Sequence, residues 1–383
     1  MSGPRSSALI ESAVASIQGH PVLRPGDRVV AAMSGGVDSS VMAALLQRAG
    51  YEVIGVSMQL FDKTRGGTTP ETEGKCCTLD DFQDARRVAY DMGFPHYVVD
   101  FEARFRDTVI DEFVEGYLRG ETPSPCIRCN QHVKFKTLLE RADALGAVFV
   151  ATGHYARITH DGAGFHLLRA ADPAKDQSYF LFSHTQETLA RTLFPLADLT
   201  KPQVRQLGRD LGLHLAEKAE SQEICFVTQN RYDTYIEEAG RAPEVGDGPI
   251  RHIDGRVLGS HRGYWRYTVG QRKGLGVAFP TPLYVLRVER DTNTVWVGDD
   301  ADLFGSEMMV RELSWCGNAP GNPLPCSAKI RSRGLEVEAI VMPLPGNRAK
   351  VAFAEAQRAI APGQAVVFYR DEEVLGGGWI SAS

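Results

Sequence analysis

The sequence has no run of apolar residues approaching the ~18 that a membrane-spanning helix needs. Residues 1–18 are not expected to be a secretory signal peptide, because they contain one arginine, one glutamate and no long apolar core. These absences argue against a membrane protein and favour a cytoplasmic location. Residues 7–17 are instead typical of a short amphipathic helix.

Cysteine is scarce, with 7 in 383 residues, which is too few for a fold held together by disulfides. Clustered cysteines in a reducing compartment are more typical of catalysis or metal binding. The net charge of −6 argues, taken alone, against a nucleic-acid partner, so the local charge has to be considered. The content of 43% apolar and 23% charged residues is that of a globular chain, and the length predicts two or three domains.

The first glycine-rich loop lacks lysine. Residues 33–40, with the sequence MSGGVDSS, connect an apolar run at 28–32 to a helical pattern at 41–49. Glycines, serine hydroxyls and the N–H groups of a helix N-terminus together form an anion site. A Walker loop would bring a lysine to the phosphates, but there is no Lys or Arg between Arg28 and Arg48. The loop resembles the PP-loop of ATP pyrophosphatases, which cleave between the α- and β-phosphates; the alternative is a turn that merely joins strand and helix.

Strand patterns alternate with helical patterns after this loop. Apolar strands are expected at 51–58, 96–100 and 148–152, with helices between them. This alternation predicts an α/β fold with a parallel sheet and helices on both faces. Ligands of such sheets gather at the carboxyl ends of the strands. The sequence therefore predicts one site, formed by the segments at these ends: the glycine-rich loop, Met58, the loop around Cys126, Gly153 and His154.

The texture of the sequence changes from about residue 242. Glycine and proline recur every few residues between short alternating strands, which predicts a small β-barrel or sandwich. We expect three domains: a nucleotide-binding domain at 1–229, a middle domain at 230–303 and a C-terminal β-barrel at 304–383.

The middle region has a local excess of positive charge. Between residues 251 and 273, six basic residues stand against the single acid Asp254, and aromatic residues are interleaved with them. This pattern predicts an RNA-binding surface with stacking platforms, the alternative being a solvated β surface. The basic residues are Arg251, Arg256, Arg262, Arg266, Arg272 and Lys273; the aromatic ones are Tyr264, Trp265 and Tyr267; a second cluster is Lys329, Arg331 and Arg333.

Cys126 and Cys129 form a C-x-x-C pair in a proline-bounded loop just before a helical pattern. The helix N-terminus and nearby basic residues are expected to lower the thiol pKa and make the pair reactive. Structural zinc is the alternative, but it requires four ligands, commonly from a second spaced pair. The other cysteines do not supply one: Cys76 and Cys77 are adjacent, Cys225 stands alone, and Cys316 and Cys326 are expected to be structural. The alternative for Cys225 is a small core residue.

Several blocks of the sequence, in order from about residue 28 to residue 379, closely resemble the tRNA-specific 2-thiouridylases of the MnmA (TrmU) family. These are PP-loop enzymes with an adenine nucleotide α-hydrolase-like sheet. Besides the glycine-rich loop, the matching blocks are TPSPCIRCN at 122–130, ATGHY at 151–155, KDQSYF at 175–180, SQEICF at 221–226, GQRKGLG at 270–276, PGQ at 362–364 and GGG at 376–378.

The resemblance implies sulfur transfer to the wobble uridine of the tRNAs for Lys, Glu and Gln. ATP, expected with Mg²⁺, would adenylate the uracil 2-carbonyl oxygen, and a persulfide on Cys225 would attack the activated carbon. Cys129 would then resolve the linkage through a transient Cys129–Cys225 disulfide, which needs later reduction. A cysteine desulfurase or sulfur-relay protein is the expected donor. The implied ATP-binding residues are Ala32, Met33, Ser34, Gly35, Gly36, Val37, Asp38, Ser39, Met58 and Gly153.

The resemblance also implies the contacts with tRNA, including an extruded target base whose buried carbonyl becomes accessible. The residues implied at the target base are Ser124, Pro125 and Cys126. Those implied elsewhere on the tRNA are His154, Lys175, Asp176, Gln177, Arg331, Ser332 and Gln364. For His154 alone, a packed core histidine is the alternative.

Cys126 departs from the family pattern, since many members carry an aspartate there that is proposed as an acid/base. Three thiols, Cys126, Cys129 and Cys225, could alternatively hold a [4Fe–4S] cluster with one open iron. We favour the persulfide route. The alternative functions are a PP-loop pyrophosphatase acting on a small metabolite, and a zinc- or RNA-binding protein with a decayed nucleotide site.

Overall fold

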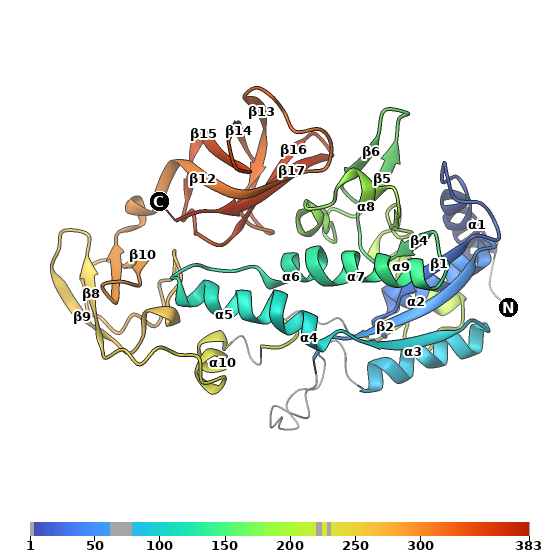
Figure 1. Ribbon diagram of the computed structural model, residues 1–383, viewed down its shortest axis with the longest axis horizontal. Coiled ribbons are helices and arrows are strands. Elements are labelled where there is room, and N and C mark those ends of the chain that lie inside the picture. Colours follow the sequence, from blue (N-terminus) through green and yellow to red (C-terminus); the bar gives the residue numbers. More distant parts are fainter. Residues whose placement is uncertain (1–3, 62–78, 220–223, 228–230, 383) are drawn as a thin grey trace. The chain divides into compact units, whose positions relative to one another are not determined.

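The computed structural model describes residues 4–61, 79–219, 224–227 and 231–382. The chain divides into two compact units, and their helices and strands are labelled in Figure 1. Unit 1 comprises Met1–Thr108, Ile127–Phe226 and Glu372–Val374; unit 2 comprises Val109–Cys126, Val227–Asp371 and Leu375–Ser383. Within the described ranges, no helix has both the length and the apolar content to span a bilayer.

A five-stranded parallel sheet with the strand order β3-β2-β1-β4-β7 organises unit 1. Its strands are β1 (Arg28–Ala32), β2 (Glu52–Gln59), β3 (His96–Asp100), β4 (Phe149–Ala151) and β7 (Thr192–Leu193). In the centre, Val30 of β1 lies opposite Ile54 of β2 and Val150 of β4. Val30 and Val150 are fully buried, as expected where a parallel strand is covered on both faces.

Helices cover this sheet on both sides. The longer ones are α1 (Pro4–Gln18), α2 (Val37–Arg48), α3 (Leu79–Met92), α7 (Lys136–Ala144) and α9 (Lys201–Asp210). Val29 and Ala31 of β1 share one core cluster with buried residues of α1, α2, α3 and α9. Because side chains alternate along a strand, Val30 points to the opposite face. There α7 packs on β1 and β4, and its buried Leu138 lies outside that cluster.

Two helical stretches contain π-helical turns, which often mark functional sites. The first stretch consists of α4 (Glu102–Phe105), the π segment η3 (Arg106–Ile110) and α5 (Asp111–Leu118). The second consists of α6 (Pro125–Arg128), the π segment η4 (Cys129–Phe135) and α7. The shorter elements of unit 1 are β5 (Arg157–His160), β6 (Phe165–Leu168), η5 (Ser178–Leu181) and α8 (Gln186–Leu189).

Unit 2 contains a four-stranded sheet and a closed barrel. The sheet has the order β10-β11-β8-β9, with α10, η7 and η8 around it. These elements are β8 (Gly248–His252), β9 (Val257–His261), β10 (Tyr284–Glu289), β11 (Thr294–Gly298), α10 (Tyr232–Glu238), η7 (Tyr264–Arg266) and η8 (Asp300–Leu303).

The barrel closes because β12 pairs with both β15 and β17. Its strands are β12 (Phe304–Trp315), β13 (Leu324–Lys329), β14 (Val337–Leu344), β15 (Arg348–Arg358), β16 (Ala365–Arg370) and β17 (Glu373–Ile380). Val310, Val341, Val351 and Phe368 fill its interior at 0% exposure. The predicted fold class is confirmed: a parallel α/β sheet with helices, followed by a middle region and a C-terminal β-barrel.

Candidate nucleotide and thiol site

The glycine-rich loop follows β1 and leads directly into α2, as predicted. Gly36 is the N-cap of α2, so the N–H groups of its first turn face the loop. The backbone N–H of Ser34 donates to Ser39 Oγ (3.2 Å), and Ser39 Oγ donates to the Gly36 carbonyl (3.1 Å). These hydrogen bonds hold the loop in a curl around the helix N-terminus, which is the arrangement an anion requires.

Gly35 allows the loop to approach α3 closely. Its φ is +72°, a left-handed conformation that favours glycine, and a Cβ built there would lie 2.2 Å from the Asp81 carbonyl oxygen. On the side of β4, Gly153 lies against the first turn of α2, at the backbone of Asp38 and Ser39. The end of β4 and the loop that follows β1 therefore lie next to each other in unit 1.

Asp38, in the first turn of α2, is held from two directions. Lys201 Nζ, from the first turn of α9, lies 2.8 Å from each of the two Asp38 carboxylate oxygens. The Tyr155 hydroxyl donates to Asp38 Oδ1 at 2.9 Å. A lysine thus reaches the loop although the loop's own sequence contains none.

A second lysine also reaches the loop. Lys218 Nζ donates to the Gly35 carbonyl (3.0 Å), to Asp81 Oδ1 (2.7 Å) and to Asp84 Oδ2 (2.6 Å). Burial alone would lower the pKa of Lys218, but the hydrogen bonds to the two carboxylates outweigh it and raise the pKa. Lys218 therefore stays charged and ties the loop to α3. Sequence reasoning missed both Lys201 and Lys218.

The segments that carry Cys129 and Cys225 both pack on α4. Phe226, next to Cys225, makes an edge-to-face contact with Phe105 of α4, with ring centroids 5.7 Å apart. Arg104 Nε of α4 donates to the His132 carbonyl in η4 (3.1 Å), the π segment that begins at Cys129. Within unit 1, α4 therefore brings the two thiol-bearing segments to one helix.

The cysteines differ in exposure. Cys129 is buried, Cys225 is half-buried and Cys126 is exposed. Cys326 is half-buried in β13, and burial raises the pKa of its thiol to about 12, so it is unreactive at neutral pH. Cys76 and Cys77, and residues 221–223 of the block before Cys225, lie outside the described residues.

Asp176 and Gln177, predicted to contact tRNA, have side-chain hydrogen bonds within unit 1. Asp176 accepts from the Ser178 hydroxyl (2.7 Å) and the Ala170 N–H (3.1 Å). Gln177 Oε1 accepts from the Tyr155 N–H at 2.9 Å. These hydrogen bonds fix the backbone of residues 175–178, which include Lys175. They also join this segment to Tyr155, whose hydroxyl donates to Asp38.

His154 follows β4 and packs among aromatic rings. Its Nδ1 lies 2.6 Å from Thr152 Oγ1, and its ring contacts Phe135 and Phe194. Burial, followed by the charge of Lys134, lowers the pKa of His154 well below its ordinary value. The imidazole is therefore neutral at pH 7.

In unit 2, the barrel braces the loop that carries Ser124, Pro125 and Cys126. Gln364 Nε2 donates to the Thr122 carbonyl (2.7 Å), and the Thr122 N–H donates to the Pro362 carbonyl (2.7 Å). The PGQ block at 362–364 therefore has a structural role, because its hydrogen bonds hold the loop that precedes the C-x-x-C pair. Arg331, beside Ser332, donates to the Ala359 carbonyl of the barrel (2.6 Å).

The prediction that aromatic residues of the middle region form a stacking platform for RNA bases is wrong. Tyr264, Trp265 and Tyr267 are only 2%, 3% and 8% exposed, so their rings are not available to nucleobases. The aromatic pattern instead forms a core, in which the Tyr264 hydroxyl donates to the Leu118 carbonyl (2.8 Å). Arg266 is also committed internally, to Asp233 and Glu237 of α10.

The exposed basic residues of the middle region are fewer than the sequence pattern suggested. Arg262, Arg272 and Lys273 are exposed. Arg256 is exposed as well, but it pairs with Asp254 at 2.7 Å. Exposed basic side chains are therefore present in the middle region, but exposed aromatic rings for base stacking are not found at Tyr264, Trp265 and Tyr267.

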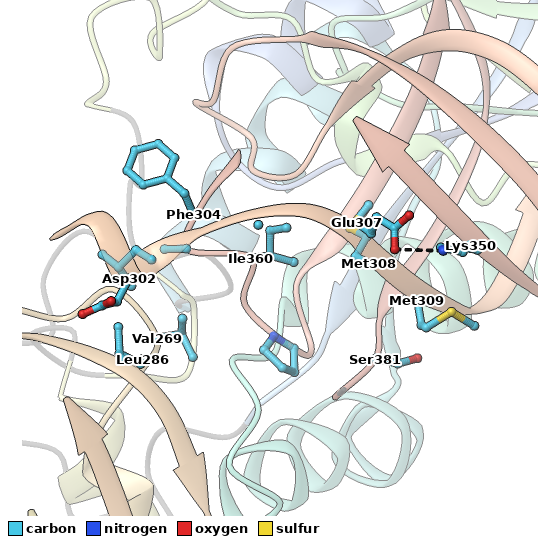
Figure 2. A pocket seen from close by; sticks show the side chains of 14 residues that line it. Val269, Leu286, Asp302, Phe304, Glu307, Met308, Met309, Lys350, Ile360 and Ser381 are labelled. Atoms are coloured by element: carbon cyan, nitrogen blue, oxygen red, sulfur yellow. Dashed lines mark ion pairs between the residues drawn. The ribbon is translucent and has the colours of Figure 1, made fainter. Parts of the chain in front are cut away.

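A cavity of about 360 Å³ in unit 2 lies beside β12 and β15 (Figure 2). Its lining is mixed: Phe304, Met308 and Ile360 are apolar, and the Glu307–Lys350 ion pair (2.8 Å) lies at one side. None of the lining residues is a cysteine or a histidine. The cavity therefore offers no thiol or imidazole, unlike the segments that carry Cys129 and Cys225 in unit 1.

Models of three known domain families match successive segments of the chain. The tRNA methyl transferase HUP domain family matches residues 27–229, its PRC-barrel domain matches 239–299, and the aminomethyltransferase beta-barrel domain matches 305–380. Among solved structures, the U34-tRNA thiolase NcsA from Methanococcus maripaludis with its [4Fe-4S] cluster has 18% identity and a TM-score of 0.37, covering 58% of this chain and 68% of that one. At that level the likeness carries no argument about chemistry.

The curated relatives match at much higher identity. A tRNA-specific 2-thiouridylase MnmA from Geobacter metallireducens is 54% identical over 360 residues, covering 93% of this chain and 97% of the relative. One of the same name from Solibacter usitatus is 49% identical over 372 residues, covering 93% and 100%. The resemblance noted in the sequence is confirmed, and the chain belongs to the tRNA-specific 2-thiouridylase family.

Proposed function

We propose that this protein catalyses the ATP-dependent 2-thiolation of the wobble uridine in the tRNAs for Lys, Glu and Gln, releasing AMP and pyrophosphate. The observation that carries the proposal is that one compact unit holds both an anion-binding loop with two lysines and two thiol-bearing segments on α4. A small-metabolite pyrophosphatase requires neither thiol. Membership of the 2-thiouridylase family supports the same conclusion.

The first step activates the base. A uracil carbonyl oxygen is a poor leaving group, so the 2-carbonyl oxygen attacks the α-phosphate of ATP and pyrophosphate departs. The resulting adenylate has AMP as its leaving group. We assign nucleotide binding to the loop and to the neighbouring strand ends: Ala32, Met33, Ser34, Gly35, Gly36, Val37, Asp38, Ser39, Met58 and Gly153.

The second step transfers sulfur. The outer sulfur of a Cys225 persulfide attacks C2, AMP leaves, and the base is joined to Cys225 through a disulfide bond. The Cys129 thiolate then attacks Cys225 Sγ, which forms a Cys129–Cys225 disulfide and releases the thiocarbonyl. An external thiol reductant restores both cysteines. Packing of both segments on α4 supports this pairing.

The contacts with tRNA remain proposals. Ser124, Pro125 and Cys126 are assigned to the target base, and their loop is braced by Gln364. Cys126 takes the place of the usual family aspartate, and its exposure suits a group that meets the base. The other assigned contacts are His154, Lys175, Asp176, Gln177, Arg331, Ser332 and Gln364.

Several accompanying assignments belong to the same proposal. Mg²⁺ accompanies ATP, and a cysteine desulfurase or sulfur-relay protein delivers the persulfide in the cytoplasm. The domain boundaries proposed at 1–229, 230–303 and 304–383 are supported by the three family matches, which fall within them. In the described part of the chain, no group of three or more His, Cys, Asp or Glu side chains is placed to hold a metal ion. We therefore derive no step through a [4Fe–4S] cluster.

The proposal is tested with the purified chain, unmodified tRNA, ATP, Mg²⁺ and a desulfurase with cysteine. We expect 2-thiouridine in nuclease digests of the tRNA, and pyrophosphate release that depends on tRNA. A tRNA whose wobble base is cytidine is the matched control and is expected to give neither product. Pyrophosphate release that is equally fast without tRNA would favour a small-molecule substrate and contradict the proposal.

A further inference from the structure

Lys201 stands at the anion-binding loop without belonging to it. Its side chain is only 9% exposed, and its Nζ contacts both carboxylate oxygens of Asp38 at 2.8 Å. Asp38 lies in the first turn of α2, whose N–H groups form the anion site. The ammonium therefore lies next to the place where phosphates would bind.

The protein fixes this lysine from its backbone outward. The Lys201 N–H donates to Asp172 Oδ2 (2.9 Å), and Thr200 caps α9 through Gln203. Helix α9 also packs against α2. The backbone of Lys201 is thus anchored next to α2, and its side chain reaches Asp38 in the first turn of that helix.

Lys201 neutralises the negative charge of the Asp38 carboxylate, which would otherwise repel a bound phosphate. A bare negative charge in the first turn of α2 would repel the phosphates of ATP. Asp38 is kept in place by the Tyr155 hydroxyl (2.9 Å) and by the close backbone of Gly153. A cation must therefore neutralise it, and pyrophosphate needs still more positive charge because it gains charge as it leaves.

We propose that Lys201 is the phosphate-contacting cation of this site: it neutralises Asp38 before ATP binds, and it binds the β- and γ-phosphates, and then the departing pyrophosphate, when ATP is present. It takes the part that a lysine inside the loop plays in a Walker motif. This assignment rests on the proposed use of ATP at the loop. It does not depend on which acceptor is adenylated.

The test measures three ligands by calorimetry on the full chain. Lys201→Met is expected to raise the Kd of ATP and of pyrophosphate at least tenfold, while the Kd of AMP, which lacks the β- and γ-phosphates, changes less than twofold. Lys201→Arg is expected to keep ATP and pyrophosphate within about threefold of the unaltered protein, because the charge is retained. Lys350→Met, which removes a half-exposed ion pair in the barrel, is the matched control.

Two results would overturn the assignment. Equal weakening of ATP, pyrophosphate and AMP would show that Lys201 only supports the local structure. Unchanged binding of all three would show that it has no role at the phosphates. Neither result depends on tRNA, so failure here is distinguishable from failure of the thiolation assay.

Discussion

Cys225→Ser is expected to lower tRNA thiolation by at least about 10³-fold, equivalent to ~4 kcal/mol of activation free energy. Serine cannot carry a persulfide, so the sulfur donor is lost while the nucleotide loop is untouched. The Kd of ATP is therefore expected to stay within twofold. The measurement is 2-thiouridine per tRNA by mass spectrometry, with ATP binding measured on the same preparation.

Cys326→Ser is the matched control, because Cys326 is half-buried in the barrel and its raised thiol pKa makes it unreactive. It is expected to thiolate tRNA at a normal rate. Cys129→Ser is expected to block a later step than Cys225→Ser does. It should accumulate tRNA joined to Cys225 through a disulfide bond that a reductant cleaves. Thiolation retained by Cys225→Ser would refute the role given to this residue.

Gly35→Ala is expected to weaken ATP binding by about 100-fold, or ~2.7 kcal/mol. Alanine disfavours the φ of +72°, and its Cβ would meet the Asp81 carbonyl oxygen at 2.2 Å, so the loop or the start of α3 must move. Movement of the loop misplaces the N–H groups that bind phosphate. Calorimetry with ATP measures the loss, and thermal unfolding reports the accompanying strain.

Gly50→Ala separates the two causes. Gly50 has a similar φ of +90°, but an added Cβ would meet nothing nearer than Pro25 Cβ at 3.6 Å. This variant is expected to lose stability by ~1 kcal/mol from the backbone strain and to bind ATP normally. ATP binding by Gly35→Ala within threefold of the unaltered protein would contradict the close approach seen at Asp81.

The anion-binding loop was predictable because its determinants are adjacent in sequence. A buried strand, two glycines and a helix start leave few other conformations, and the structure shows Gly36 as the N-cap. The parallel sheet was predictable for a similar reason, since alternating strand and helix patterns of this length admit few other folds. Closure of the barrel depends on pairing between β12 and β17, which the sequence pattern left open.

The two lysines at the loop were not predictable from local patterns. Lys201 is 163 residues from Asp38, and Lys218 is 183 residues from Gly35. Lys201 lies in the first turn of α9, and nothing in the sequence indicates which helix end meets the loop. Absence of a lysine from the loop therefore did not mean absence of a cation from the site.

The aromatic platform was predicted wrongly because a local sequence pattern was taken as evidence of exposure. Basic and aromatic residues alternate along the chain around Trp265 in the way an RNA-binding surface would, but exposure is set by tertiary packing. The rings of Tyr264 and Trp265 are buried. Arg266 pairs with acidic residues of α10, among them Asp233, which lies 33 residues before it in the sequence. Composition alone could not distinguish a core from a binding surface.

A single-turnover reaction tests the transfer of sulfur from a Cys225 persulfide most directly. Iron-free protein, purified without oxygen and loaded with labelled persulfide, is mixed with ATP, Mg²⁺ and unmodified tRNA in the absence of any further sulfur source. We expect one labelled 2-thiouridine per Cys225 persulfide and the simultaneous appearance of a Cys129–Cys225 disulfide. Thiolation that occurs only after a [4Fe–4S] cluster is reconstituted, with no disulfide formed, would contradict this transfer.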